Sequence, residues 1–179
     1  MFLSITKSPL PGDALLQRFV DSGDYTDCFV TGIDTQVALA DYVEAFYTTA
    51  VFKAERLVLK WAVARPSTDR EAKQLANGVI DAFAAWTVVE RRENQMLLMD
   101  VRGQTCSWFM LTAEPVGSRL FFGSAVIRSE KTPTGPRMKW TYRSLLGFHR
   151  VYSRVLLWAA RRRLLGSAGG SRAQAGSDD

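Results

Sequence analysis

Two side chains of this sequence could take part in proton transfer. His149 is the only histidine, and imidazole is the side chain whose ordinary pKa lies nearest neutral pH. Asp100 shares strand parity with Met96 and Leu98, so a buried strand face there would raise the pKa of its carboxyl group. We name both as candidates for general acid–base catalysis. The simpler interpretations are a boundary position for His149, and strand-end exposure or pairing with Arg102 for Asp100.

The sequence does not indicate metal or cofactor chemistry. One histidine and two cysteines without CxxC spacing do not make a zinc site. We interpret Asp24-x-x-Asp27 as a solvated strand entry rather than a metal site. No Walker A, GxSxG or GxGxxG sequence occurs, so we predict no metal and no cofactor. Cys28 and Cys106 lie in strand-like runs and are predicted to be core thiols in a reducing compartment.

Positive charge is concentrated in one part of the chain. Residues 119–165 contain eleven Lys or Arg and one acid, whereas residues 1–118 contain 11 Lys or Arg and 15 Asp or Glu. A concentrated field attracts anions. Three partners fit it: the acidic part of the chain itself, an anionic membrane or ligand, or nucleic acid, which is the least favoured. Contact with an anionic surface would use Arg150, Arg154, Arg161, Arg162 and Arg163.

Length and composition indicate one soluble globular domain. At 179 residues and 47% hydrophobic content, the chain can bury one core but hardly two. We predict an irregular stretch over 1–12, a single domain over 13–165 and a disordered tail rich in Gly, Ala and Ser over 166–179. No secretory signal or membrane-spanning run is visible, so we predict a cytoplasmic protein.

The expected elements change period along the chain. Helical patterns are predicted for Asp13–Val20, Gln36–Ala50 and Lys53–Arg65, with a capping box at Thr68-x-x-Glu71 starting a further short helix. Strand patterns number five: Tyr25–Ile33, Phe83–Arg92, Gln95–Arg102, Gln104–Ala113 and Arg119–Ser129. The separators of the last four are so short that these strands must form an antiparallel meander. The order predicts an α+β fold with helices segregated from the sheet.

A long helix over Ser144–Leu164 is the expected cover of the sheet. Phe148, Tyr152, Val155 and Ala159 fall within an arc of about 40°. Arg150, Arg154 and Arg161 fall on the far side, with Leu157 between them. We therefore expect the aromatic side to face the sheet and the arginines to face outward. The simpler interpretation of the aromatic side is plain core, and the sharper one is the wall of a cavity.

Short motifs and the element order resemble a known superfamily. The motifs are Asp24–Phe29, Ser107–Met110, Arg119–Ala125 and Leu146–Arg150. They resemble an uncharacterised bacterial family assigned to the START/Bet v 1-like (SRPBCC) superfamily, over roughly residues 10–165. That resemblance implies a helix-grip fold. In this fold an antiparallel sheet wraps around a long C-terminal helix and leaves a hydrophobic cavity between them. A full domain of that kind has six or seven strands, and five are counted here.

Three functions follow as expectations. The first is binding of a hydrophobic or amphipathic molecule, lipid or polyketide-like, between sheet and last helix, without chemistry. The candidates for its lining are Trp86, Leu98, Trp108, Met110, Phe148 and Tyr152. The second is a cyclase or isomerase using Asp100 or His149, although a non-enzyme is favoured. The third is an accessory protein that docks an anionic membrane or partner through the last helix.

Overall fold

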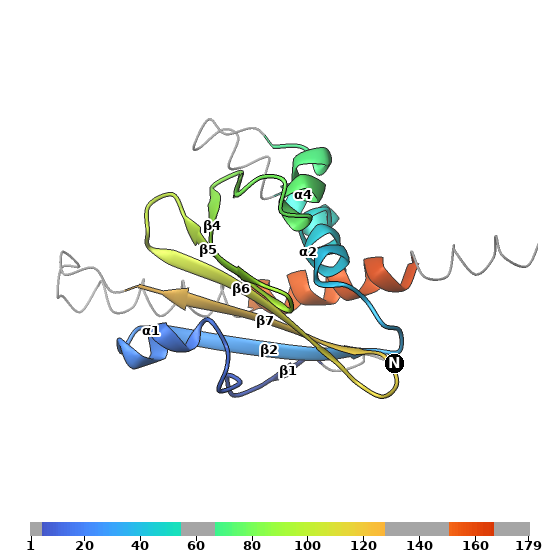
Figure 1. Cartoon of the computed structure of the whole chain (residues 1–179), viewed down its shortest axis with the longest axis horizontal. Helices are drawn as coiled ribbons and strands as arrows, with labels where there is room; N and C mark the ends of the chain where they lie inside the picture. The colour runs from blue at the N-terminus through green and yellow to red at the C-terminus, as the bar shows by residue number, and fades with distance from the viewer. Residues whose placement is uncertain (1–4, 55–66, 128–150, 167–179) are drawn as a thin grey trace, which may run out of the picture.

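The computed structural model describes residues 5–54, 67–127 and 151–166 of the chain. They form an α+β fold on one open antiparallel sheet of seven strands, in the order β1-β2-β7-β6-β5-β4-β3 (Figure 1). The strands are β1 (Thr6–Lys7), β2 (Tyr25–Ile33), β3 (Ala82–Phe83), β4 (Trp86–Arg92), β5 (Gln95–Asp100), β6 (Thr105–Ala113) and β7 (Ser118–Val126). The helices are α1 (Gln17–Asp21), α2 (Leu39–Tyr47), α4 (Asp69–Ala76), a helical stretch at 50–54 and a C-terminal helix described over 151–166.

The predicted meander is confirmed. Strands β4 to β7 pair antiparallel with their neighbours in sequence, and the turns after β5 and β6 contain Gly103 and Gly117, both with positive φ. The predicted count of five strands is wrong. The structure adds β1 and β3 at opposite edges, each two residues long and too short to show a pattern. β1 also lies in the stretch 1–12 that we expect to be irregular.

The first long strand lies beside the last strand. All nine residues of β2 pair with β7, from Tyr25 opposite Val126 to Ile33 opposite Ser118. This pairing brings the segment after β2 to the turn between β6 and β7. There the backbone N–H of Val37 donates to Ser118 Oγ (3.2 Å).

The helix starts were predicted with mixed success. The capping box of α4 is confirmed: Thr68 Oγ1 accepts from the Glu71 N–H, and Glu71 Oε2 accepts from the Thr68 N–H. The helix predicted from Gln36 begins only at Leu39, because residues 36 and 37 bond to the sheet instead. The helix predicted from Asp13 begins at Gln17. The helix predicted over 53–65 lies mostly outside the described residues.

Helix α2 covers the centre of one face of the sheet. The ring of Phe46 lies 4.8 Å from that of Phe109 and 4.7 Å from that of Phe122. The hydroxyl of Tyr42 donates to the carbonyl oxygen of Phe121 (3.1 Å). Burial of a side chain such as Phe46 contributes about 1.5–3 kcal/mol. α2 therefore takes the central place that the sequence assigns to the last helix.

The N-terminal segment covers the opposite face. Leu15 and Leu16 pack there with Trp108, and Gln95 joins the two layers. Its Oε1 accepts from the Leu15 N–H and from Trp108 Nε1, both at 2.9 Å. At the edge Arg18 pairs with Glu90, and that hydrogen bond lowers the pKa of the Glu90 carboxyl. Both faces of the sheet are thus covered by protein.

The C-terminal helix packs along the β2 side of the helical face, and the face it buries centres on Leu157 and Ala160 rather than on Val155. Tyr152 of the predicted inner face still packs against the core. The buried residues of the helix are Ser153, Leu156, Leu157, Ala160, Arg161 and Leu164. Val155, expected inside, is 38% exposed. Leu157, expected outside, belongs to the core. The helix carries apolar residues on two sides, so periodicity alone could not choose between them.

Candidate functional site

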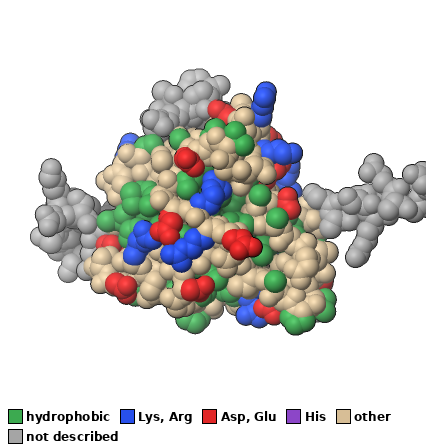
Figure 2. All heavy atoms as spheres, in the orientation of Figure 1, with side chains coloured by type: hydrophobic (Ala, Val, Ile, Leu, Met, Phe, Trp, Pro, Cys, Tyr) green, Lys and Arg blue, Asp and Glu red, His purple; other side chains and the backbone are tan. Residues whose placement is uncertain are grey.

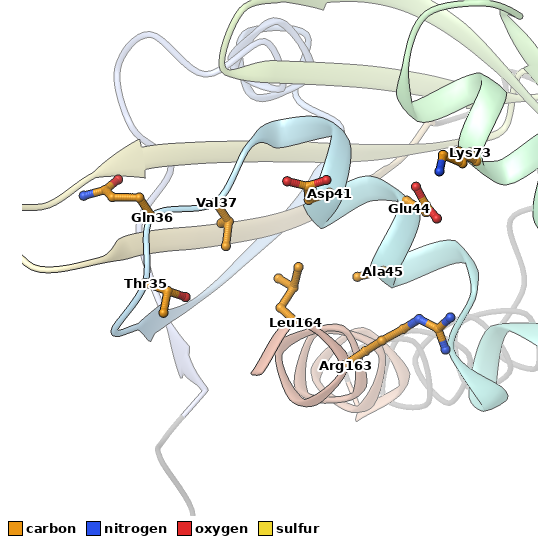
Figure 3. A pocket seen from close by; sticks show the side chains of 9 residues that line it. All are labelled: Thr35, Gln36, Val37, Asp41, Glu44, Ala45, Lys73, Arg163 and Leu164. Carbon is orange, nitrogen blue, oxygen red and sulfur yellow. The ribbon is translucent and has the colours of Figure 1, made fainter. Parts of the chain in front are cut away.

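A hollow of about 470 Å³ lies on the helical side of the sheet (Figure 3). It is bounded by the loop between β2 and α2, by α2, by α4 and by the end of the C-terminal helix. Its lining residues are Thr35, Gln36, Val37, Asp41, Glu44, Ala45, Lys73, Arg163 and Leu164. They come from parts of the chain that are far apart in sequence, so only the tertiary fold assembles the site.

The loop wall of the hollow is fixed to the sheet. Gln36 Nε2 donates to the carbonyl oxygen of Glu114 (2.9 Å), and Val37 is held by Ser118. Gly117 allows this contact. A Cβ there would lie 1.9 Å from the carbonyl oxygen of Ile33, and the φ of +91° disfavours any other residue. The loop is therefore held by contacts that do not involve the lining side chains of the helices.

Charges of both signs surround the hollow. Asp41 and Glu44 lie three residues apart on α2, which places them on neighbouring positions of one helix face. Lys73 of α4 and Arg163 of the C-terminal helix lie on the other sides, and Figure 3 shows Arg163 extending toward the α2 side of the hollow. Among the described residues, no ion pair or side-chain hydrogen bond engages Asp41, Glu44 or Lys73. These three groups are available to a ligand.

Three of the nine residues that line the hollow are apolar. Figure 3 shows Val37 and Leu164 pointing into it from opposite sides, with Ala45 on the α2 wall. At the loop end, Thr35 Oγ1 is buried and finds no hydrogen-bond partner in the described part of the chain. A buried hydroxyl without a partner costs about 1–3 kcal/mol. The lining therefore combines a few apolar side chains with a larger number of charged and polar groups.

Two other hollows are less suited to a ligand. One of about 520 Å³ lies beside α4, but its arginines are already engaged. Arg91 donates to the carbonyl oxygens of Leu75 and Ala76, and Arg92 pairs with Glu90. The other, of about 360 Å³, lies near the N-terminal segment.

The structure does not bring the predicted lining residues together. Leu98 belongs to the core under the helices, and Trp86 and Tyr152 pack against that core. Trp108 and Met110 belong to the core on the opposite face. Phe148 lies outside the described residues. A sheet separates the two groups, so they cannot line one cavity, and none of the five described residues lines the hollow.

Of the two candidates for proton transfer, only Asp100 lies within the described residues. Asp100 holds the turn between β5 and β6: its Oδ1 accepts from the N–H groups of Gln104 (2.6 Å) and Thr105 (2.9 Å). The expected alternative partner, Arg102, is not among these donors. His149 lies outside the described residues. The bonds of Asp100 indicate a structural role.

The arginines of the last helix do not form one outward face. Arg161 is 8% exposed, and its Nε donates to the carbonyl oxygen of Gly32 (2.7 Å). Arg154 bonds to the carbonyl oxygen of Ile5 and lies over the ring of Phe29. The expectation that both point away from the sheet is wrong, because each satisfies a carbonyl at the sheet edge. Arg162 and Arg163 are exposed, and Arg150 lies outside the described residues. On the face in Figure 2, basic and acidic side chains lie close together.

A buried carboxyl that the sequence analysis missed lies between β2 and β7. Asp27 is 3% exposed. Its Oδ1 accepts from the N–H (3.2 Å) and hydroxyl (2.5 Å) of Ser124, and its Oδ2 from the Tyr25 hydroxyl (3.3 Å). The interpretation of Asp27 as solvated is therefore wrong. Its polar atoms are engaged by the neighbouring strand, so we assign it to holding β2 against β7.

The prediction that both cysteines are core thiols is confirmed. Cys28 and Cys106 are free and buried, and burial raises the pKa of each thiol to about 12. In the ranges 5–54, 67–127 and 151–166, no group of three or more His, Cys, Asp or Glu residues could hold a metal ion. Over the same residues, no helix combines the length and apolar character needed to cross a bilayer.

The acidic pair of the hollow was not among the predicted site residues. Asp41 and Glu44 could have been found as an acidic pair with helical spacing opposite the apolar stripe of the predicted 36–50 helix. No local sequence pattern marked Lys73 or Leu164 as residues that line a site. No family model matches the chain, and no curated protein matches it. We therefore infer function from the geometry of the hollow.

Proposed function

We propose that the protein binds an amphipathic small molecule in the hollow between the 34–38 loop, α2, α4 and the C-terminal helix, without chemistry. The observation that carries this proposal is the arrangement of Asp41, Glu44 and Lys73. They stand unpaired, within the described residues, around the apolar side chains of Val37, Ala45 and Leu164. Unpaired charges of opposite sign that line one hollow favour a ligand that satisfies both.

The size of the hollow fits this proposal. Small-molecule sites commonly enclose about 300–1,000 Å³, and this hollow holds about 470 Å³. The apolar body of the ligand would lie over Val37, Ala45 and Leu164. A cationic group would bind beside Asp41 and Glu44, and an anionic group beside Lys73. A lipid-derived or polyketide-like molecule with polar ends meets these requirements.

The arrangement of elements supports a helix-grip assignment within the START/Bet v 1-like superfamily. β2 pairs with β7, the helices between them follow β2, and the four-stranded meander precedes the C-terminal helix. That helix packs on the same face as α2, and the hollow lies where the two meet. Two free buried cysteines are consistent with a reducing, cytoplasmic compartment.

Native mass spectrometry of the full chain purified from its own cells tests the proposal. We expect the wild type to carry a bound small molecule. Val37→Trp places an indole in the hollow and should abolish that extra mass. Val79→Trp is the matched control, because Val79 is 67% exposed in the turn after α4, away from the hollow's lining residues. It should retain the ligand.

Charge variants separate loss of the ligand from loss of fold. Glu44→Gln and Lys73→Gln change little in volume, and each should weaken binding about tenfold, the usual effect of removing one charge-assisted hydrogen bond. Asp21→Asn, an exposed carboxyl at the end of α1, is the control and should bind normally. The proposal fails if the wild-type protein carries no small molecule, or if Val37→Trp retains the same bound small molecule as the wild type.

A further inference from the structure

The outward side of the C-terminal helix carries an exposed apolar stripe. Its members are Val151 (62% exposed), Val155 (38%), Trp158 (37%) and Leu165 (37%). With Arg162 they follow the spacing i, i+4, i+7, i+11 and i+14, which places them within an arc of about 80°. Contiguous exposed apolar side chains on the outer face of a folded domain are the usual mark of a contact surface.

The helix is held so that this stripe points away from the sheet. Leu157 and Ala160 on the opposite side are fully buried in the core. Arg161 fixes the rotation of the helix through its bond to Gly32. Leu164, which lines the hollow, also lies on the buried side. The stripe is therefore separate from the proposed ligand site and does not depend on it.

Positive charge accompanies the stripe. Residues 151–166 contain four arginines and no Asp or Glu, and all of these arginines except the buried Arg161 are exposed. The guanidinium of Arg162 lies over the ring of Trp158, 4.9 Å from its centroid, so a cation sits within the stripe itself. Arg154 and Arg163 lie on either side of the stripe at helical spacing. A partner for this face must accept apolar side chains and carry negative charge.

We infer that the outer face of the C-terminal helix docks on an anionic lipid surface. An interfacial amphipathic helix combines Trp and aliphatic residues on one side with arginines beside them, and Trp favours the headgroup level. The apolar side chains would enter the headgroup boundary while Arg162, which lies over Trp158 within the stripe, meets lipid phosphates. Each arginine near such a surface strengthens binding about fivefold.

Two other occupants fit the face less well. The spacing of the stripe also suits a coiled coil with a second copy. In that case arginines would oppose arginines, because this helix segment offers no acid in return. A nucleic acid would match the charge, but single strands bind by stacking on aromatic side chains, and this stripe has one aromatic ring among aliphatic residues.

Vesicle flotation of the full chain tests the inference. We expect binding to phosphatidylcholine vesicles that contain phosphatidylglycerol, and none to phosphatidylcholine alone. Trp158→Ala and Val151→Ser should each weaken binding, by on the order of tenfold for Trp158. Val116→Ser is the matched control, because Val116 is 78% exposed in the turn between β6 and β7.

Arg162→Glu should weaken vesicle binding on the order of tenfold, whereas Arg102→Glu, exposed in the turn between β5 and β6, should not. Equal binding to neutral and anionic vesicles would overturn the inference, as would anionic binding that survives both Trp158→Ala and Arg162→Glu. A dimer lost in Trp158→Ala without vesicle binding would identify a second copy instead. Retention of an oligonucleotide but not of vesicles would identify a nucleic acid.

Discussion

The side chain of Arg161 is tied to the carbonyl oxygen of Gly32, with Nε donating over 2.7 Å. This bond joins the C-terminal helix to β2 across most of the chain length. It places Leu157 and Leu164 inward and Trp158 outward. Both proposals depend on that rotation, because the hollow uses the inner side of the helix and lipid docking uses the outer side.

Removal of this guanidinium should destabilise the fold. Arg161→Ala leaves the Gly32 carbonyl without its donor, and a hydrogen bond to a charged group contributes about 1.5–3 kcal/mol. We expect that loss in the free energy of unfolding, measured by urea denaturation. Arg162→Ala, which removes an exposed cation over Trp158, should cost less than about 1 kcal/mol. Equal costs for the two variants would contradict the buried position of Arg161.

The buried carboxyl of Asp27 should be more important to stability than its neighbours in sequence. Asp27→Ala removes the acceptor for both donors of Ser124, and we expect a loss of about 3 kcal/mol in the free energy of unfolding. Asp24→Ala, at a half-buried position just before β2, provides the comparison and should cost less. A loss below about 1 kcal/mol in Asp27→Ala would show that the carboxyl is not buried.

The two native thiols should stay unreactive in the folded protein. Burial raises the pKa of both Cys28 and Cys106 to about 12, so neither forms the reactive thiolate near pH 8. Ellman's reagent should titrate no thiol before denaturation and both after it. The folded pKa of each thiol exceeds the unfolded one, so burial of the neutral thiols makes stability depend on pH. Their contribution to the free energy of unfolding is complete below about pH 9 and is lost as the pH rises toward 12. Rapid labelling of native protein would contradict the burial.

Gly117 should tolerate no side chain. In Gly117→Ala the new Cβ would meet the Ile33 carbonyl at 1.9 Å in a backbone with φ of +91°. We expect a cost of about 2 kcal/mol or more, together with weaker ligand binding because the loop wall would shift. Gly12→Ala is the control, since nothing lies within 4 Å of its Cβ. Thermal unfolding of the two variants should differ clearly, and equal transitions would refute the contact.

Local patterns predicted the elements better than their assembly. The meander followed from its short separators, and the α4 start followed from Thr68 and Glu71, because both depend on neighbours in sequence. Register does not. Leu97, not Leu98, pairs with Trp108, and a shift of one residue moves a side chain to the other face. That is why Leu98 and Trp108 lie on opposite sides of the sheet.

The rotation of the last helix could not be predicted because the helix has two apolar sides. Periodicity located the wider side around Val155, whereas the fold buries the narrower side around Leu157 and Ala160. Small residues at 153 and 160 allow close approach, and arginine bonds to the carbonyls of Gly32 and Ile5 fix the choice. Those partners lie far away in sequence, and the same is true of the residues that line the hollow.

Thiol mapping of the last helix tests its rotation most directly, and both proposals depend on that rotation. Because the native thiols are buried, the reactivity of one introduced cysteine can be measured with Cys28 and Cys106 left in place. We predict that Val155→Cys reacts with Ellman's reagent nearly as fast in the folded protein as in the unfolded one. Ala160→Cys should react as slowly as Cys28 and Cys106. The reverse order, with Ala160→Cys fast and Val155→Cys protected, would contradict the account.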